Sequence, residues 1–389
     1  RGTQKVTLII ELYLKIMQLS IVIPCLNEIE TIEICINKCL QSIKKMNIEA
    51  EVILADNGST DGSIELAEKL GARVKRIKDK GYGNALRGGI KNAKGKYIIM
   101  ADSDDSYDFL CIDHFYNKLI DGYDMVQGCR FPVGGGRIED NAMPFSHKYF
   151  GNPFFSFLSK LFFSLPFNDV YCGFRGFDRK KFLELNHFSS GMVFAIENLI
   201  KFKVSGARCA EIPVTLYKDG RKKNTSHLNT ISDGWTTLRF LMVTCPKWLF
   251  FFPAIIFFIL SAVSAYDLSN LLNTKVSLSL FERFSSTIVY FLLGFQIFMF
   301  GLFSSLIATK LQMQKPKNIN IFFKIFKIRY AFLISSFLIT LILLDSFFFD
   351  VYLLNDHIQK IIYPFIIFFS ILLIINSLFV SLITIEDQK

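Results

Sequence analysis

The sequence predicts an α/β domain with a mostly parallel, doubly wound sheet, followed by an all-α membrane domain of four transmembrane helices. Up to Val214, short apolar runs rich in β-branched residues alternate with helical patterns, which is typical of parallel sheets. After Trp248 the chain becomes almost continuously apolar. At 389 residues it is long enough to hold both parts.

The strands of the sheet are expected at the apolar runs of the first part. These runs cover residues 19–24, 51–55, 72–77, 96–100, 124–129 and 207–214. Helices between the first four should end near Lys45, Leu70 and Gly95. Acids and glycines recur directly after successive strands, so their loops should converge on one edge of the sheet. Open α/β sheets bind ligands at that edge, and its composition here suits a nucleotide.

The run 96–100 ends abruptly at three carboxylates, those of Asp102, Asp104 and Asp105. Packing is a poor explanation for acids at the end of a buried strand. Asp102 and Asp104 flank a single residue, so both can approach one hard divalent cation, which prefers oxygen ligands. A solvated acidic turn is the alternative interpretation, and the D-x-D pattern alone does not decide between the two.

The net charge of +10 is carried by cations that stand beside apolar segments. That distribution favours a membrane surface as partner over nucleic acid. The eight cysteines form no C-x-x-C pair and no spacing with His that suits zinc, and they fit a reduced, cytosol-facing domain. Cys35 and Cys39 share a helical face, where we expect small buried hydrophobes.

The chain is expected to divide into four parts. We interpret residues 1–16 as an extraneous extension, because Met17 stands just ahead of the first strand as a natural start. The α/β domain should then cover 17–227, a juxtamembrane amphipathic helix 228–247, and the transmembrane domain 248–389.

Four segments of the last part are long and apolar enough to span a bilayer. They lie near 248–266, 286–309, 330–349 and 361–385. Residues 310–329 carry six cations and no acid, so the positive-inside rule places them in the cytoplasm. An even number of spans puts the α/β domain and the C-terminus on the same side, in a multi-pass protein of the cell's inner (cytoplasmic) membrane. A buried four-helix domain is the alternative, which four such segments in a row disfavour.

Residues 147–165 combine many phenylalanines with His147, Lys148 and Lys160. This segment is either ordinary core or an amphipathic helix that lies in the membrane interface. We favour the second, because a membrane anchor follows. The helix before Trp248, which carries Trp235, is also expected to lie at the membrane interface.

Six motifs stand in a recognisable order. They are Ile23-Pro24-Cys25-Leu26-Asn27-Glu28, Asp56-Asn57-Gly58-Ser59-Thr60-Asp61-Gly62, Gly81-Tyr82-Gly83-Asn84-Ala85-Leu86-Arg87-Gly88-Gly89, Ala101-Asp102-Ser103-Asp104, Gly128-Cys129-Arg130-Phe131, and Asp169 with Gly173-Phe174-Arg175. Over roughly residues 19–248 the chain resembles family 2 glycosyltransferases, which have the Rossmann-like GT-A fold. It resembles most the branch of dolichyl-phosphate mannose synthase and polyprenyl-phosphate glucosyltransferases.

The resemblance implies a donor site and a metal site. Asp102 and Asp104 are the implied ligands of Mg²⁺ or Mn²⁺ on the donor diphosphate. The implied donor-site residues are Pro24, Asn27, Glu28, Asp56, Asp61, Lys80 and Arg87. The sequence departs from the usual family pattern at two positions. Asn57 replaces the second acid of the commoner Asp-Asp-Gly-Ser form, and Ser106 stands where mannose synthases often carry a metal-binding Gln, so we do not count it as a ligand.

The resemblance also implies residues at the phosphates and at the reaction centre. Arg130 and Arg175 are expected to face the donor and acceptor phosphates, and a basic loop with Arg221 and Ser226 is expected to close over the site. Asp169 matches a position sometimes assigned as catalytic base. With Asp104 and Arg130 it completes the implied catalytic set.

The implied reaction is an inverting, metal-dependent transfer of a hexose from a UDP- or GDP-sugar to a polyprenyl phosphate such as undecaprenyl or dolichyl phosphate. A lipid monophosphate has its second pKa near ~6 and is already nucleophilic at neutral pH. It therefore needs orientation and charge screening more than deprotonation. We expect a modest loss of activity for Asp169→Asn and a severe one for Asp104→Ala.

Two other functions stay open. A processive membrane polysaccharide synthase ranks second, because the sequence lacks the Gln-x-x-Arg-Trp motif of such enzymes. A non-catalytic membrane scaffold or lipid-sugar translocase would leave Asp102 and Asp104 dispensable. The sequence leaves open which sugar, nucleotide and lipid are used, and whether the chain forms a homo-oligomer.

Overall fold

A computed structural model describes residues 17–222, 230–271, 278–315, 328–348 and 356–384. The predicted extension 1–16 and the predicted site residue Ser226 lie outside these residues. Contacts divide the chain into two compact units, Arg1–Leu241 and Met242–Lys389, and each is described by itself.

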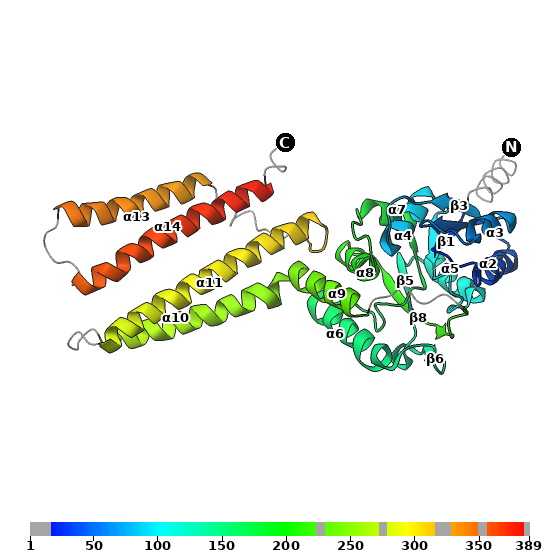
Figure 1. Cartoon of the computed structure of the whole chain (residues 1–389), viewed down its shortest axis with the longest axis horizontal. Helices are drawn as coiled ribbons and strands as arrows, with labels where there is room; N and C mark the ends of the chain where they lie inside the picture. The colour runs from blue at the N-terminus through cyan, green and yellow to red at the C-terminus, as the bar shows by residue number, and fades with distance from the viewer. Residues whose placement is uncertain (1–16, 223–229, 272–277, 316–327, 349–355, 385–389) are drawn as a thin grey trace, which may run out of the picture. The chain divides into compact units, whose positions relative to one another are not determined.

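The first unit is built on a seven-stranded sheet with the order β3-β2-β1-β4-β7-β5-β8 (Figure 1). Its strands are β1 (Leu19–Cys25), β2 (Ala50–Asp56), β3 (Arg73–Arg76), β4 (Tyr97–Met100), β5 (Met125–Cys129), β7 (Arg175–Asp178) and β8 (Cys209–Pro213). The sheet is mostly parallel, as predicted. Strand β7 runs antiparallel to its neighbours β4 and β5, and the sequence pattern does not predict it. A separate short pair joins β6 (Arg137–Ile138) to β9 (Thr215–Leu216).

Helices cover the sheet and complete the core. They are α2 (Ile32–Met46), α3 (Ser63–Lys69), α4 (Tyr82–Asn92), α5 (Ile112–Ile120), α7 (Arg179–Glu184) and α8 (Phe194–Val204). The central strand β1 is buried at every position, as a strand flanked on both faces must be. In α2 the buried face repeats at Ile32, Cys35, Ile36 and Cys39, so both cysteines are small core residues, as predicted.

The order of the sheet reverses at β1. The chain runs from β1 to β2 and β3 on one side and then returns to place β4 on the other. The loops after β1, β2 and β4 therefore meet at the carboxyl edge, where sheets of this topology bind their ligands. These loops carry Asn27, Asn57 and Asp102, and Asp56 ends β2 at the same edge.

Two helices of the first unit expose aromatic side chains. A π-helical turn, His147–Gly151, leads into α6 (Asn152–Phe163), and α9 (Thr230–Thr244) lies beside α6 (Figure 1). Large apolar side chains on these segments are exposed. They are Phe150 at 66%, Phe154 at 49%, Phe157 at 60% and Trp235 at 60%. We call these four residues the aromatic surface. The predicted helix is confirmed, and its place in a membrane interface stays a prediction.

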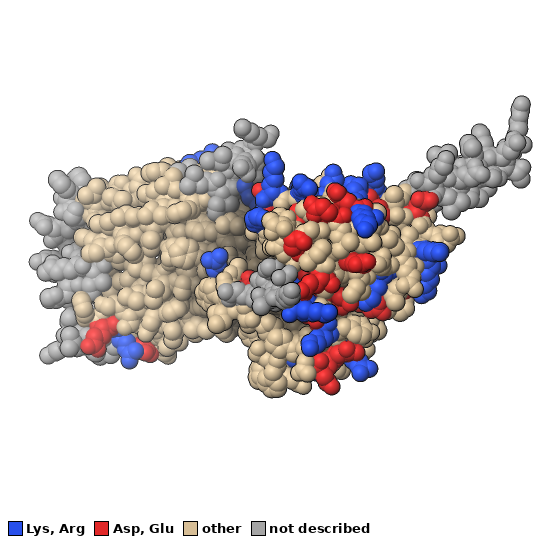
Figure 2. All heavy atoms as spheres, turned by 45° about the vertical axis from the view of Figure 1, so that its right-hand side comes forward, with Lys and Arg blue, Asp and Glu red and all other residues tan. Residues whose placement is uncertain are grey.

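The second unit consists of long helices, α10 (Phe252–Leu271), α11 (Leu278–Lys310), α13 (Ile328–Phe348) and α14 (Asp356–Thr384). Three segments are long and apolar enough to cross a membrane: Lys247–Leu268, Phe281–Lys310 and Ile362–Ser381. On the face drawn in Figure 2 the helical part is almost free of charged side chains. The predicted fourth span, 330–349, corresponds to a shorter apolar helix, Arg329–Leu344. Four spans are therefore not confirmed, but the protein has the composition of a membrane protein.

Candidate active site

Asp102 follows β4 and is held from two sides. The hydroxyl of Tyr82, at the start of α4, donates a hydrogen bond to Oδ1 at 3.0 Å. A Cβ atom added to Gly173 would collide with Oδ2, so a larger residue there would force the carboxylate to shift. Burial and the negative charge of Asp104 raise the pKa of Asp102 to about 6.

Asp104 is oriented by its own loop. Its Oδ1 accepts hydrogen bonds from the Ser106 backbone N–H at 3.1 Å and from the Ser106 hydroxyl at 2.6 Å. Its Oδ2 lies 3.8 Å from Nη2 of Arg221. Ser106, which the sequence does not favour as a ligand, therefore contacts the predicted ligand instead.

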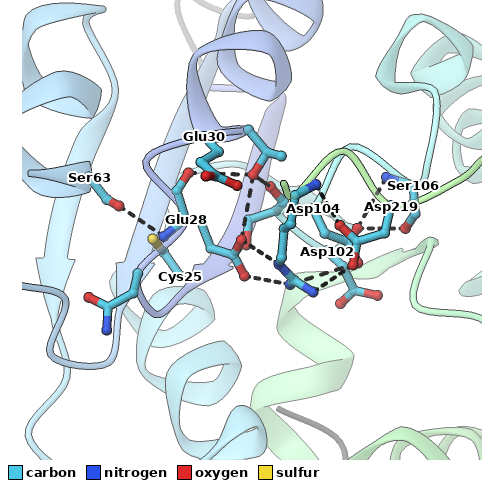
Figure 3. Close-up of polar contacts among 12 residues, drawn as sticks. Cys25, Glu28, Glu30, Ser63, Asp102, Asp104, Ser106 and Asp219 are labelled. Carbon is cyan, nitrogen blue, oxygen red and sulfur yellow. Dashed lines mark hydrogen bonds and ion pairs between the residues drawn. The ribbon is translucent and has the colours of Figure 1, made fainter. Parts of the chain in front are cut away.

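Arg221 is the cation at the centre of these acids. It pairs with Glu28 through Nη2–Oε1 at 2.5 Å and Nε–Oε2 at 2.8 Å, and with Asp219 through Nη1–Oδ2 at 2.8 Å. Figure 3 shows Glu28, Asp104 and Asp219 converging here, with Asp102 next to Asp104. The backbone next to Arg221 is held against the loop after β4, because the Gly220 N–H donates to the Asp104 carbonyl at 2.9 Å. The structure thus brings Arg221 to the predicted metal site.

This set suits a divalent cation that also binds phosphate oxygens. Across the ranges that the structure describes, no group of three or more His, Cys, Asp or Glu side chains forms a complete metal cage. Mg²⁺ is commonly held by one or two carboxylates together with substrate phosphates rather than by a protein cage. Asp102 and Asp104 fit that donor set.

The loops after β1 and β2 hold each other in place. Both oxygens of Asp56 accept backbone hydrogen bonds, from Gly58 at 2.9 Å and Ser59 at 3.0 Å. Asn27, in the left-handed region at φ 60°, accepts from the Thr60 N–H at 2.8 Å. Pro24 lies within buried β1. The structure thus brings Pro24, Asn27 and Asp56 to one edge, and their contact with a nucleotide stays a prediction.

Three predicted donor-site residues contact other parts of the protein. Asp61 accepts from the backbone N–H groups of Ser63 at 3.0 Å and Ile29 at 2.9 Å, and so ties the loop after β1 to the start of α3. Lys80 donates to the Asn57 carbonyl at 2.6 Å. Arg87 donates to the His187 carbonyl and to the Asn84 side chain. Their role toward a donor stays a prediction.

Asn57 has a structural reason to replace an acid. Its amide nitrogen donates to the carbonyls of Ile77 at 3.2 Å and Asp79 at 2.8 Å, and its oxygen accepts from the Gly81 N–H at 2.7 Å. An ionised aspartate could not donate to those carbonyls.

Arg130 and Asp169 form a buried pair. Nε and Nη2 of Arg130 donate to the two carboxylate oxygens at 2.7 and 2.8 Å, and its backbone N–H donates at 3.1 Å. Asp169 is fully buried. Arg175 is also fully buried, and donates to the carbonyls of Cys172 and Ala195 at 2.7 and 2.8 Å. In this arrangement the three side chains bind the protein's own groups rather than facing outward to phosphates.

Sequence reasoning missed two residues of this site. Tyr82 lies between the glycines of a motif already noted, and its position was the available signal. Asp219 gave no signal beyond standing two residues before Arg221.

Comparison with known proteins identifies the family. The family model described as Glycosyl transferase family 2 matches residues 20–185. Dolichyl-phosphate hexose transferase of Haloferax volcanii is 30% identical over 165 residues, which are 42% of this chain and 69% of that protein. This chain belongs to glycosyltransferase family 2. The family predicted from the motifs is therefore confirmed.

Two other relatives extend well beyond the matched region. The low-salt glycan biosynthesis hexosyltransferase Agl6 of H. volcanii is 33% identical over 60% of this chain and 55% of its own length. Glycosyltransferase AglJ of the same organism is 31% identical over 48% of this chain and 59% of its own length. The chain thus spans just over half of these relatives. A solved glucosyl-3-phosphoglycerate synthase of Mycobacterium tuberculosis, in complex with Mn²⁺ and UDP, is 21% identical with a TM-score of 0.45, over 59% of this chain and 80% of that one.

Proposed function

We propose that this family 2 protein is an inverting, metal-dependent hexosyltransferase that moves a hexose from a UDP- or GDP-sugar to a polyprenyl phosphate, either undecaprenyl or dolichyl phosphate. The observation that carries the proposal is the pair Asp102 and Asp104 at the reversal of the sheet, with Arg221 beside them. The names of the relatives support a hexose donor and a lipid-phosphate acceptor.

The charge balance of the site supports metal dependence. Glu28, Asp104 and Asp219 share the guanidinium of Arg221, and Asp102 adds a further carboxyl group. A donor diphosphate brought next to these acids would be repelled. Mg²⁺ or Mn²⁺ held by Asp102 and Asp104 would supply the positive charge that neutralises the leaving diphosphate. Ser106 keeps one oxygen of Asp104 occupied and so orients the other.

A phosphate acceptor needs no general base, which is consistent with an Asp169 that is already paired with Arg130. A dianionic lipid phosphate is nucleophilic without a base. Both oxygens of Asp169 are bound by Arg130, so we propose that Asp169 positions Arg130 rather than accepting a proton. Attack from the face opposite the leaving diphosphate inverts the anomeric centre, and an α-linked donor would give a β-linked lipid product.

We further propose that the aromatic surface of α6 and α9 meets the lipid. A polyprenyl chain stays in the bilayer, so its phosphate has to be met at the membrane surface. The apolar helices of the second unit and the predicted cytoplasmic side of residues 310–329 support a multi-pass enzyme of the inner membrane whose catalytic unit faces the cytoplasm.

The test is product formation in membranes that contain the full chain. Membranes are incubated with labelled UDP- and GDP-sugars and undecaprenyl phosphate, and the glycolipid is identified by mass spectrometry. We expect a singly glycosylated lipid phosphate that disappears with EDTA and with Asp104→Ala. Asp140→Ala, which removes an exposed acid elsewhere, is the control and should retain activity.

The same assay separates the alternatives. A polymer in place of one sugar per lipid would identify a processive synthase. A scaffold or translocase would give no labelled product with any donor, and no effect of Asp104→Ala. Either result would overturn the proposed transfer.

A further inference from the structure

We infer that Tyr82 is a positioning residue that aims Asp102 at the cation, and that residues 186–191 hold Tyr82 in place. The inference rests on the proposed function, in which Asp102 is a metal ligand. Its basis is the set of contacts around the start of α4.

Tyr82 contacts one oxygen of Asp102, and the backbone at Gly173 lies close to the other. The phenol donates to Oδ1 at 3.0 Å, and Gly173 packs so closely on Oδ2 that it has no room for a Cβ atom. The carboxylate is thereby fixed in rotation. A neutral phenol does this without a positive charge that would compete with a cation, and hydrogen-bonded carboxylate ligands are a general feature of metal sites.

The start of α4 is in turn pressed against residues 186–191. The Asn84 N–H donates to the Ser190 carbonyl at 3.2 Å. A Cβ atom at Gly81 or Gly83 would collide with the carbonyl oxygens of Ser190 or Ser189. Tyr82 stands between these two glycines, so the backbone on both sides of it is fixed by the same segment.

A buried ion pair anchors that segment. The Glu197 carboxylate on α8 accepts the backbone N–H groups of Phe188 at 2.9 Å and Ser189 at 2.8 Å, and pairs with Lys201 at 2.9 Å. Lys201 donates to the Asn186 carbonyl at 2.7 Å. Both charged side chains are fully buried, so breaking the pair would leave a buried charge unpaired. Contacts therefore run without interruption from Glu197 through the 186–191 segment to Tyr82 and Asp102.

The decisive variant is Tyr82→Phe, which removes only the hydroxyl. Tyr116→Phe is the matched control, because the Tyr116 hydroxyl also makes one hydrogen bond, to the Gln18 side chain at 2.5 Å, away from the acids. The full chain in detergent is titrated with Mn²⁺ at pH 8 in the presence of UDP or GDP, and bound Mn²⁺ is followed by electron paramagnetic resonance. Glycolipid formation is then measured as a function of Mn²⁺ concentration.

We expect Tyr82→Phe to weaken Mn²⁺ binding about tenfold and to raise the Mn²⁺ concentration for half-maximal rate equally, with the maximal rate recovered at saturating Mn²⁺. Tyr116→Phe should bind Mn²⁺ like the wild type. Unchanged Mn²⁺ binding in Tyr82→Phe would overturn the inference. So would a maximal rate that stays low even at saturating Mn²⁺, because that result indicates a general structural defect.

Two further variants complete the test. Glu197→Gln should weaken Mn²⁺ binding in the same direction, and Tyr82→Phe/Glu197→Gln should be no weaker than the worse single variant, because both act through one path. Additive losses would overturn the role of residues 186–191. Asp102→Asn distinguishes a failure of the proposed metal site from a failure of the role inferred for Tyr82. If Asp102→Asn binds Mn²⁺ like the wild type, the metal site itself is refuted. If it loses binding while Tyr82→Phe does not, only the inference fails.

Discussion

The guanidinium of Arg221 makes two parallel hydrogen bonds to the carboxylate of Glu28, at 2.5 and 2.8 Å, across 193 residues of chain. The side chains are only 10% and 4% exposed. Planar, two-point pairing of this kind is specific to arginine. It joins the loop after β1 to the segment that contacts Asp104, and makes the two loops one structural unit.

Arg221→Gln should therefore reduce stability as well as donor binding. Loss of one partner leaves Glu28 as an unpaired buried carboxylate, which costs about 3 kcal/mol, or on the order of 10 °C in the unfolding midpoint. Glu28→Gln/Arg221→Gln should recover much of the midpoint, because Glu28 is the most buried of the acids that Arg221 neutralises, but should not recover donor affinity. Thermal unfolding and nucleotide titration measure the two effects. Recovery of both by the double variant would show that Arg221 is only structural.

Gly173→Ala should disable Asp102 without changing any polar group. The added methyl group would collide with Oδ2 of Asp102, so the carboxylate has to turn away. We expect Mn²⁺ affinity to fall by about 10–100-fold. Gly151→Ala is the control, since its Cβ atom would make only an ordinary contact, 3.7 Å from the Ser146 carbonyl oxygen. Equal Mn²⁺ affinities in the two variants would contradict the placement of Asp102.

The raised pKa of Asp102 predicts a pH-dependent stability. Burial and Asp104 raise its pKa from 3.8 to about 6, so the fold disfavours the ionised form. The metal-free protein should then lose stability as the pH rises from about 4 to 6. Asp102→Asn removes this loss, and we expect it to unfold at a higher temperature than the wild type at pH 7.5 in EDTA.

The comparison at low pH serves as the control for that prediction. Near pH 4.5 Asp102 is still protonated in the fold and only part of the loss has developed, so the wild type and Asp102→Asn should differ less in unfolding temperature than at pH 7.5. Addition of Mn²⁺ and nucleotide at pH 7.5 should stabilise the wild type alone. A constant difference between the two proteins from pH 4.5 to 7.5 would refute the raised pKa.

The pair Arg130–Asp169 allows a base to be distinguished from a positioning residue. A general base contributes about 10²–10⁴-fold to the rate. Because Asp169 is bound by Arg130 through both oxygens, Asp169→Asn should destabilise the protein yet lower the rate per folded enzyme less than tenfold, whereas Asp104→Ala should abolish it. Rates are normalised to nucleotide-binding sites at a temperature below unfolding. Equal, severe losses would restore Asp169 as a base.

The sheet and the candidate metal ligands could be predicted because both depend on local sequence. Short apolar runs rich in β-branched residues mark β1, β2, β4 and β5, and polar residues directly after a parallel strand must lie at the carboxyl edge of the sheet. Strand β7 could not be predicted in this way, because its sequence Arg175-Gly176-Phe177-Asp178 is short, charged at both ends and contains glycine. Contacts between distant side chains carry no periodic signal. Neither the Arg221–Glu28 pair nor the burial of Arg175 could therefore be predicted.

The aromatic surface predicts a defect that depends on the acceptor lipid. Phe155 is only partly exposed and packs edge-on against Tyr171, so its replacement would disturb packing as well as the surface. The exposed side chains of Phe150, Phe154 and Phe157 are the better set. Their joint replacement by Ser removes apolar area from the surface without opening a cavity.

We expect this triple variant to lose activity toward undecaprenyl phosphate in membranes by about tenfold or more, because the site is no longer held at the depth of the lipid phosphate. Activity toward a short-chain, water-soluble polyprenyl phosphate should be retained, since that acceptor does not have to be met at the bilayer. Val133→Ser, which removes an apolar side chain that is 74% exposed elsewhere on the first unit, is the control and should behave like the wild type. Parallel loss of activity toward both acceptors would indicate misfolding instead, and retention of both would remove the aromatic surface from the account of how the acceptor is met.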